Sequence, residues 1–77
     1  MSYKALDTVV LARDLSSHNL RSGDLGVVVE VYDAGHIEVE FVTASGSTEA
    51  LVTLAAADVR PVDDGDIIAV RRFRRTA

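Results

Sequence analysis

The chain has 77 residues, no cysteine and a net charge of −4, from 12 acidic and eight basic side chains. A chain of this length forms one domain with a small core, and the lack of cysteine excludes disulfides, thiolate catalysis and cysteine metal sites. No apolar run approaches the roughly 20 residues that cross a bilayer, and the first residues lack the apolar segment of a signal peptide, so we expect a cytoplasmic protein with no membrane contact.

The first expected strand covers residues 7–12, with apolar side chains on both faces. Residues 13–22 then form a polar connection of ten residues. Its two leucines, Leu15 and Leu20, are expected to fold back onto the core. The loop is therefore predicted to pack on its own domain rather than to extend into solvent.

The segment 23–41 is predicted to form a β-hairpin, with strands over 27–32 and 37–41 joined by the reversal 33–36. Side chains alternate across a strand, which gives the hairpin one apolar face and one acidic face. The apolar face is expected to contain Val27, Val29, Val31, Ile37, Val39 and Phe41. The opposite face is expected to contain Val28, Glu30, Tyr32, Glu38 and Glu40.

The glutamates of this hairpin are expected to be neighbours across the strand pair. Each like-charge contact would cost a few tenths of a kcal/mol, which a cationic partner would relieve. The glycines are expected to serve the turns: Gly35 with a positive φ in the reversal, and Gly23 and Gly26 in a similar role at the entry.

The second half of the body is shorter and more apolar. A turn rich in small residues at 43–47 leads to an apolar strand over 49–54. Residues 55–58 are too few for a stable helix and fit a single helical turn. The only proline then ends a short strand over 59–61, where the loss of an amide donor is tolerated.

This order of strand, long loop, hairpin, strand, helical turn and short strand predicts an all-β fold. The expected architecture is a small five-stranded SH3-like barrel over residues 1–62. Residues 63–77 are expected to form a C-terminal extension with a basic tail. Within it, 67–70 is predicted to form an added edge strand or an oligomer contact.

Several blocks of this sequence resemble a bacterial family of small proteins catalogued as domain-of-unknown-function family 4926. The resemblance rests on residues 6–11, 23–28, 39–42, 52–54 and 58–62. The resemblance covers about residues 5–62. It implies an SH3-like barrel but does not imply any activity. The Gly-Asp-x-Gly-x-Val block is also similar to the KOW motif of ribosome- and polymerase-associated domains, which implies RNA binding as an alternative.

Residues that could carry catalysis or bind a metal are sparse. His18 and His36 lie in predicted loops without a metal-ligand spacing between them. The serines lack the context of a nucleophile elbow. The acidic residues within 63–66 lack the longer ligand series of a calcium loop and are expected to be solvated. We therefore predict a non-enzymatic protein without a cofactor or a metal.

Charge is divided unevenly along the chain. Residues 1–70 contain 12 acidic and four basic side chains, a net charge of −8, and the other four basic side chains follow. An acidic body would steer a basic protein into contact. The expected partner-binding residues are Glu30, Tyr32, Glu38 and Glu40, with the loop around His18 adding contact area. The predicted function is an acidic protein-binding module, antitoxin-like or immunity-like, that occludes a basic protein.

The basic tail supports two other hypotheses. An acidic body repels a phosphate backbone, so nucleic acid is expected to contact the tail and not the barrel. On this hypothesis the protein is an RNA- or ribosome-associated module that binds through its tail. The tail would equally dock on the acidic face of a second subunit, which predicts a structural accessory protein that oligomerises. The residues expected to make either contact are Arg71, Arg72, Phe73, Arg74 and Arg75.

Overall fold

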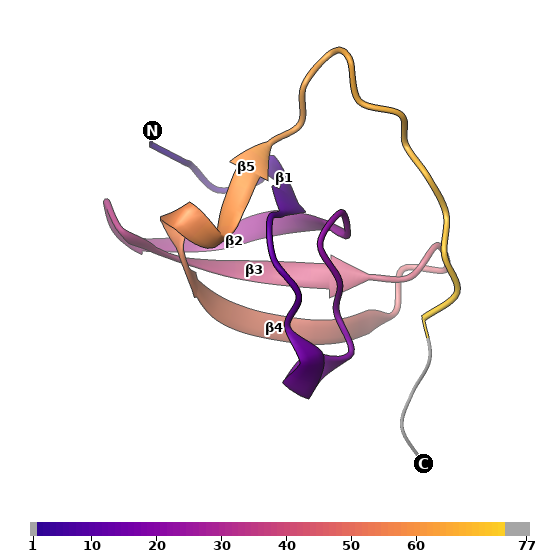
Figure 1. Ribbon diagram of the computed structural model, residues 1–77. Helices are drawn as coiled ribbons and strands as arrows, with labels where there is room; N and C mark the ends of the chain where they lie inside the picture. The colour runs from indigo at the N-terminus through magenta and orange to yellow at the C-terminus, as the bar shows by residue number, and fades with distance from the viewer. Residues whose placement is uncertain (1, 74–77) are drawn as a thin grey trace.

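The structure, a computed structural model that describes residues 2–73, is an all-β domain with five antiparallel strands in one curved sheet (Figure 1). The strands are β1 (Thr8–Leu11), β2 (Leu25–Asp33), β3 (His36–Val42), β4 (Thr48–Ala55) and β5 (Val59–Pro61). Two short 3-10 turns complete the regular structure, η1 (Ser16–His18) and η2 (Ala56–Asp58). The sheet order is β4-β3-β2-β1-β5. The predicted all-β class with five strands is therefore confirmed.

The element order matches the expected one, from the long loop to the single turn before the last strand. The short strand and the turn before it lie where the sequence predicts them. The prediction of an extra strand over residues 67–70 is wrong, because within residues 2–73 the chain beyond β5 forms no strand. The assignment of this sheet to the SH3-like barrels stays a prediction.

The core lies between the curved sheet and the loop that joins β1 to β2. Leu15 and Leu20 from this loop are both buried and exchange backbone hydrogen bonds of 2.9 and 3.1 Å. The predicted anchoring of the loop is thus confirmed. The largest fully buried side chains belong to β1, β2 and β3: Val9, Leu11, Val28, Ile37 and Val39.

A bulge in β2 changes the alternation that the sequence predicts. Val28 pairs with Val39 and is fully buried, so it lies on the core face and not on the acidic face. Val29 is then skipped in the pairing, and the next pair joins Glu30 to Glu38. The extra residue reverses the phase of the strand. Without this bulge, Glu30 would follow Val28 into the core.

Gly26 is required for packing and not for a positive φ. A β-carbon at Gly26 would lie 2.5 Å from Cγ1 of Val39 and 2.9 Å from Cε1 of Phe41. Gly23 does have the expected positive φ, +98°, whereas Gly35 does not. The Gly-Asp-Leu-Gly block therefore combines one turn glycine with one glycine that lets two core side chains approach the backbone of β2.

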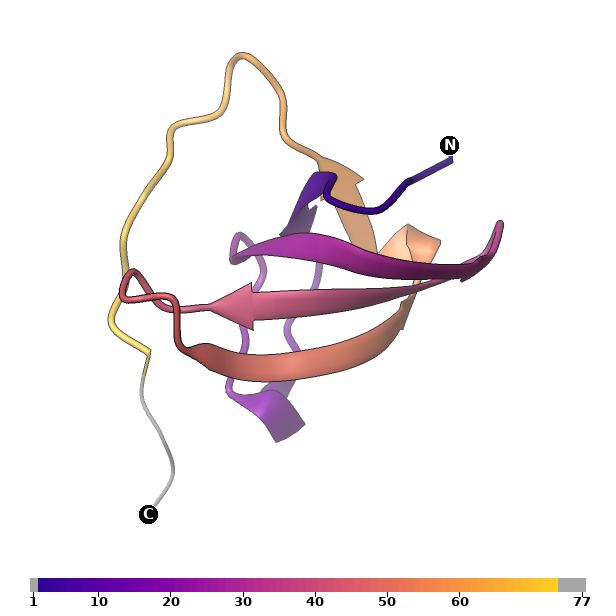
Figure 2. The same ribbon diagram turned by 180° about the vertical axis from the view of Figure 1, so that it is seen from behind.

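One face of the β2–β3–β4 part of the sheet is left uncovered by the other segments of residues 2–73 (Figure 2). The loop with η1 lies behind these three strands when they are seen as in Figure 2, and no ribbon crosses in front of them. The side chains on this outer face come from residues paired with Glu38 and Glu40, on β2 and on β4. This open face displays the hairpin glutamates.

Candidate functional site

Three glutamates from the β2–β3 hairpin share the outer face. Glu30 lies directly opposite Glu38 in the antiparallel pair, and Glu40 lies two residues along β3, opposite Val27. Glu30 is exposed, whereas Glu38 and Glu40 are half-buried. We refer to Glu30, Glu38, Glu40 and Tyr32 as the acidic sheet face.

Apolar and hydroxyl groups lie between these carboxylates. The Tyr32 hydroxyl donates a hydrogen bond to Oε1 of Glu38, and this bond raises the pKa of the Tyr32 phenol. Leu51 and Thr53 of β4 lie opposite Glu40 and Glu38, and the Leu51 side chain is 56% exposed. Long cationic side chains bury their aliphatic stems on apolar surface while the charge reaches a carboxylate, so a face with both kinds of group suits lysine and arginine.

Four aspartates bind cationic or imidazole side chains within the fold, whereas Glu38 and Glu40 accept hydrogen bonds from the hydroxyls of Tyr32 and Thr48. Each of these aspartates also accepts a hydrogen bond from a backbone amide of its own turn. The pairs are Asp24 with Arg71, Asp33 with His36, Asp58 with Arg13, and Asp66 with Arg60.

The hydrogen bond from Arg13 lowers the pKa of Asp58, and the amide of Gly35 lowers that of Asp33. By contrast, across residues 2–73 no ion pair includes any of the three glutamates of the acidic sheet face. Their charges are therefore not compensated by the described part of the chain.

Comparison with known proteins places the chain in a family. Residues 5–61 match the family model described as Domain of unknown function (DUF4926). The chain belongs to this family. The resemblance predicted from the sequence blocks is thus confirmed. No curated protein and no solved structure matches the chain significantly.

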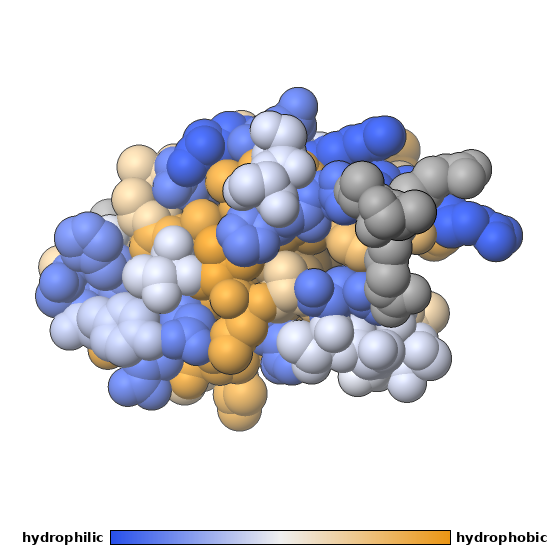
Figure 3. All heavy atoms as spheres, turned by 90° about the horizontal axis from the view of Figure 1, so that it is seen from below, coloured by the Kyte–Doolittle hydropathy of each residue, from blue (hydrophilic) through white to orange (hydrophobic). Residues whose placement is uncertain are grey.

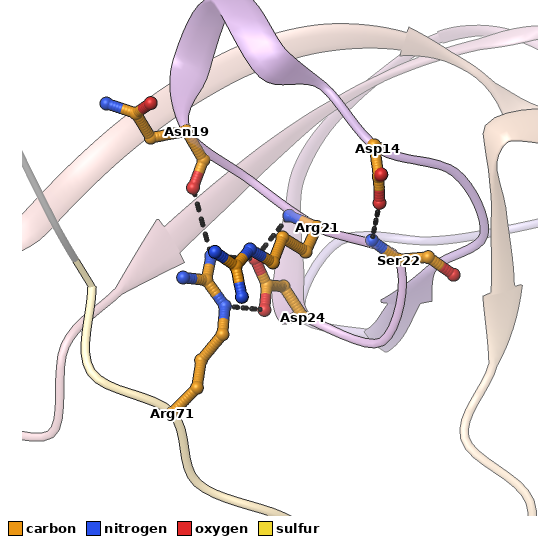
Figure 4. Close-up of polar contacts among 6 residues, drawn as sticks. All are labelled: Asp14, Asn19, Arg21, Ser22, Asp24 and Arg71. Atoms are coloured by element: carbon orange, nitrogen blue, oxygen red, sulfur yellow. Dashed lines mark hydrogen bonds and ion pairs between the residues drawn. The ribbon is translucent and has the colours of Figure 1, made fainter.

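The basic segment of this DUF4926 protein folds back in part onto its own body (Figure 4). Arg71 donates from Nε and Nη2 to the Asp24 carboxylate at 2.8 and 2.6 Å, and from Nη2 to the Asn19 carbonyl at 3.0 Å. Phe73 packs against the core, with the Arg71 guanidinium 5.9 Å from its ring centroid. Arg72 is exposed, and Arg74 and Arg75 lie outside the described residues.

A groove of about 850 Å³ runs between the 66–73 segment and the sheet. Leu25, Phe41 and Val42 line it from the sheet, and Ile68 lines it from the segment. Ion pairs of Arg60 with Asp66 and of Arg71 with Asp24 hold the segment near its two ends. The pairing of Arg71 with Asp24 was not predicted from the sequence, because the two residues are 47 positions apart and no local pattern links them.

The histidines are not brought together with the acidic sheet face. His18 is exposed in η1, and His36 bonds Asp33 in the hairpin turn through Nδ1, at 3.0 Å. Among residues 2–73, no three His, Cys, Asp or Glu side chains lie close enough to hold a metal ion. No helix in this described range could span a membrane.

Proposed function

We propose that this DUF4926 protein is a non-enzymatic binding module whose acidic sheet face captures a basic protein. The observation that carries the proposal is the contrast between the two kinds of acid. Four aspartates have both a turn amide and a side-chain partner, whereas Glu30, Glu38 and Glu40 share an open face without an ion pair in the described chain. Carboxylates that have no ion pair within the described residues are the ones available to a cationic partner.

The energetics of the face favour a cationic ligand. Like charges directly opposite each other in an antiparallel pair are destabilising, and a lysine or arginine between Glu30 and Glu38 would convert this repulsion into attraction. The charge of the face would also speed diffusional encounter with a basic surface, most strongly at low salt. Leu51 adds apolar contact area beside the carboxylates.

The specific biological form of the proposal is an antitoxin-like or immunity-like protein that acts in the bacterial cytoplasm by occluding its partner. A small SH3-like barrel would supply the rigid sheet that such occlusion needs. Fold analogy supplies no function by itself, so the proposal depends on the carboxylates and not on the architecture.

A pull-down from the native host with the tagged protein tests the proposal. We expect one stoichiometric basic protein that survives nuclease treatment, and its loss in the variant Glu30→Lys/Glu38→Lys. The variant Asp63→Lys/Asp64→Lys is the matched control, because it changes the net charge equally at exposed positions outside the sheet. Equal capture by both variants would contradict the proposal.

The same experiment addresses the tail-based alternatives. Recovery that depends on nucleic acid would favour an RNA-associated module that uses the arginines beyond β5. The fold-back of Arg71 onto Asp24 and Asn19 leaves Arg72 as the exposed arginine of the described tail. An empty lane together with self-association would favour the oligomerising accessory subunit.

A further inference from the structure

Among the residues that the structure describes, 2–73, the outer edge of β4 is open for hydrogen bonding. At the end of the β3–β4 pair, the amide of Ala56 donates to the carbonyl of Gly35 at 2.8 Å. Every second pair from there is also of the hydrogen-bonded kind, which includes Leu54 with Ile37 and Val52 with Val39. Hydrogen-bonded pairs alternate with non-hydrogen-bonded pairs along an antiparallel ladder. The residues between, Leu51 and Thr53, therefore direct their amides and carbonyls away from β3.

Ala55 provides independent support for this assignment. It has the same parity as Leu51 and Thr53, and its amide donates to Oδ2 of Asp58 at 3.3 Å and not to β3. Within the described residues, the edge is thus closed by a carboxylate at Ala55 and open at Thr53 and Leu51. Natural edge strands are often protected by proline or lysine, and β4 contains neither.

The open backbone groups and the acidic sheet face belong to the same place on the molecule. The side chains of Leu51 and Thr53 lie on the outer face, because these residues pair with Glu40 and Glu38. β4 is the lowest strand in Figure 1, and the view from below shows a band of hydrophobic side chains between hydrophilic ones (Figure 3). A strand added at this edge would therefore lie beside two carboxylates.

We infer that β4 accepts an extended basic segment of the partner as an additional antiparallel strand, with Lys or Arg at every second position. Residues opposite Leu51 and Thr53 would place their side chains on the outer face, two strand spacings or about 10 Å from β3. A lysine or arginine there spans this gap across Leu51 to reach Glu40 and Glu38. This inference rests on the proposed function and names the form of its ligand.

Charge favours a basic partner over a second copy of this chain at the edge. Glu49 is the only charged residue of β4, so a second β4 would bring no cation. It would also place two acidic sheet faces side by side. Antiparallel addition to a sheet edge gives affinity through main-chain hydrogen bonds and specificity through alternate side chains.

The test uses a fluorescent eight-residue peptide of alternating lysine and valine, with its affinity for the whole protein measured by anisotropy. In the proposed register the lysine amides face β4 and the valine amides face solvent. N-methylation of the two central lysine amides should weaken binding about tenfold or more, because two hydrogen bonds are lost. N-methylation of the two central valine amides, the matched control, should change the affinity less than about twofold on the same reasoning.

Protein variants separate this inference from the proposed function. Thr53→Pro removes an outward amide and no ladder bond, a position where proline is tolerated, and it should weaken the unmodified peptide while the circular dichroism spectrum stays unchanged. Equal binding of both methylated peptides, or no binding of the unmodified peptide, would overturn the inference. If the host partner still depends on Glu30 and Glu38 in that case, the proposed function stands without it.

A dimer that dissociates in Thr53→Pro would also overturn the inference, because the edge would then belong to a second copy. Sedimentation of the unmodified protein and of this variant reveals that outcome. The peptide comparison does not depend on the variant, so it decides the question even if Thr53→Pro fails to fold.

Discussion

Glu30 lies directly opposite Glu38 across the β2–β3 pair, on the face of the sheet that no other segment of residues 2–73 covers (Figure 2). Such a pair repels and destabilises the fold to which it belongs. Neither glutamate takes part in an ion pair among residues 2–73, so the same repulsion that lowers the stability of the hairpin favours the binding of a cation.

Replacement of one of these glutamates should stabilise the fold. Glu30→Lys converts a repulsive cross-strand pair into an attractive one, so we expect the free energy of unfolding to rise by between about 0.2 and 1 kcal/mol. Urea unfolding at low and high salt measures this, and the gain should shrink in high salt. Glu30→Gln should give a smaller gain. A loss of stability in both variants would show that Glu30 has a structural role.

Gly26→Ala should destabilise the core. The added β-carbon would lie 2.5 Å from Cγ1 of Val39, and overpacking of this kind costs about 1–3 kcal/mol. Gly65→Ala is the control, because nothing lies within 4 Å of its β-carbon position and its φ is not positive. Urea midpoints for the two variants measure the difference, and equal midpoints would contradict the packing role of Gly26.

The loop leucines should contribute as much as core residues. Leu20→Ala removes a side chain that is only 3% exposed, and a change of this kind costs about 2–5 kcal/mol. Leu6→Ala, at a position 80% exposed, should leave thermal stability nearly unchanged. Similar melting temperatures for Leu20→Ala and the unmodified protein would show that the 13–22 loop does not anchor the core.

The attachment of the 66–73 segment should depend on pH through Asp24. Burial raises the pKa of this carboxyl, but hydrogen bonds from the Arg71 side chain and the Arg21 amide outweigh it, so the net pKa lies below its ordinary value of 3.8. A lowered pKa stabilises the fold above the unfolded value, and this contribution is lost as the pH falls through the folded value.

The stability difference between the unmodified protein and Asp24→Asn should therefore be constant above about pH 5 and shrink in acid below 3.8. Urea unfolding over this range measures it, with Asp64→Asn as the control. A difference that persists unchanged below the folded pKa would contradict the ionic attachment. Arg71→Ala should cost only about 1 kcal/mol at neutral pH, because water screens a partly exposed pair.

The sequence predicts the strands, the loop anchors and the shared position of the hairpin glutamates, because each depends on local alternation or on a residue's own preference. The bulge at Val29 was not predictable in this way. The apolar residues around Gly26, at 25 and 27–29, do not by themselves reveal which valine faces inward. That is decided by the pairing of Val28 with Val39 on the neighbouring strand. The contact between Arg71 and Asp24 is equally hidden, since it requires knowledge of where the chain returns.

The site itself was predictable only in part. The glutamates and Tyr32 follow from the hairpin pattern, but the contribution of β4 does not. Leu51 and Thr53 join the face because the β3–β4 register places them opposite Glu40 and Glu38. A register between strands joined by a loop of small residues is decided by the whole sheet and not by the residues of one strand.

The measurement that tests the central claim most directly is heteronuclear NMR of the labelled protein during titration with the purified partner from the pull-down. We predict that the largest amide shifts occur at Glu30, Tyr32, Glu38 and Glu40 and in the adjoining strand β4, and that they disappear in Glu30→Lys/Glu38→Lys. Shifts confined to the 13–22 loop or the 66–73 segment, with the acidic sheet face unchanged, would contradict the account.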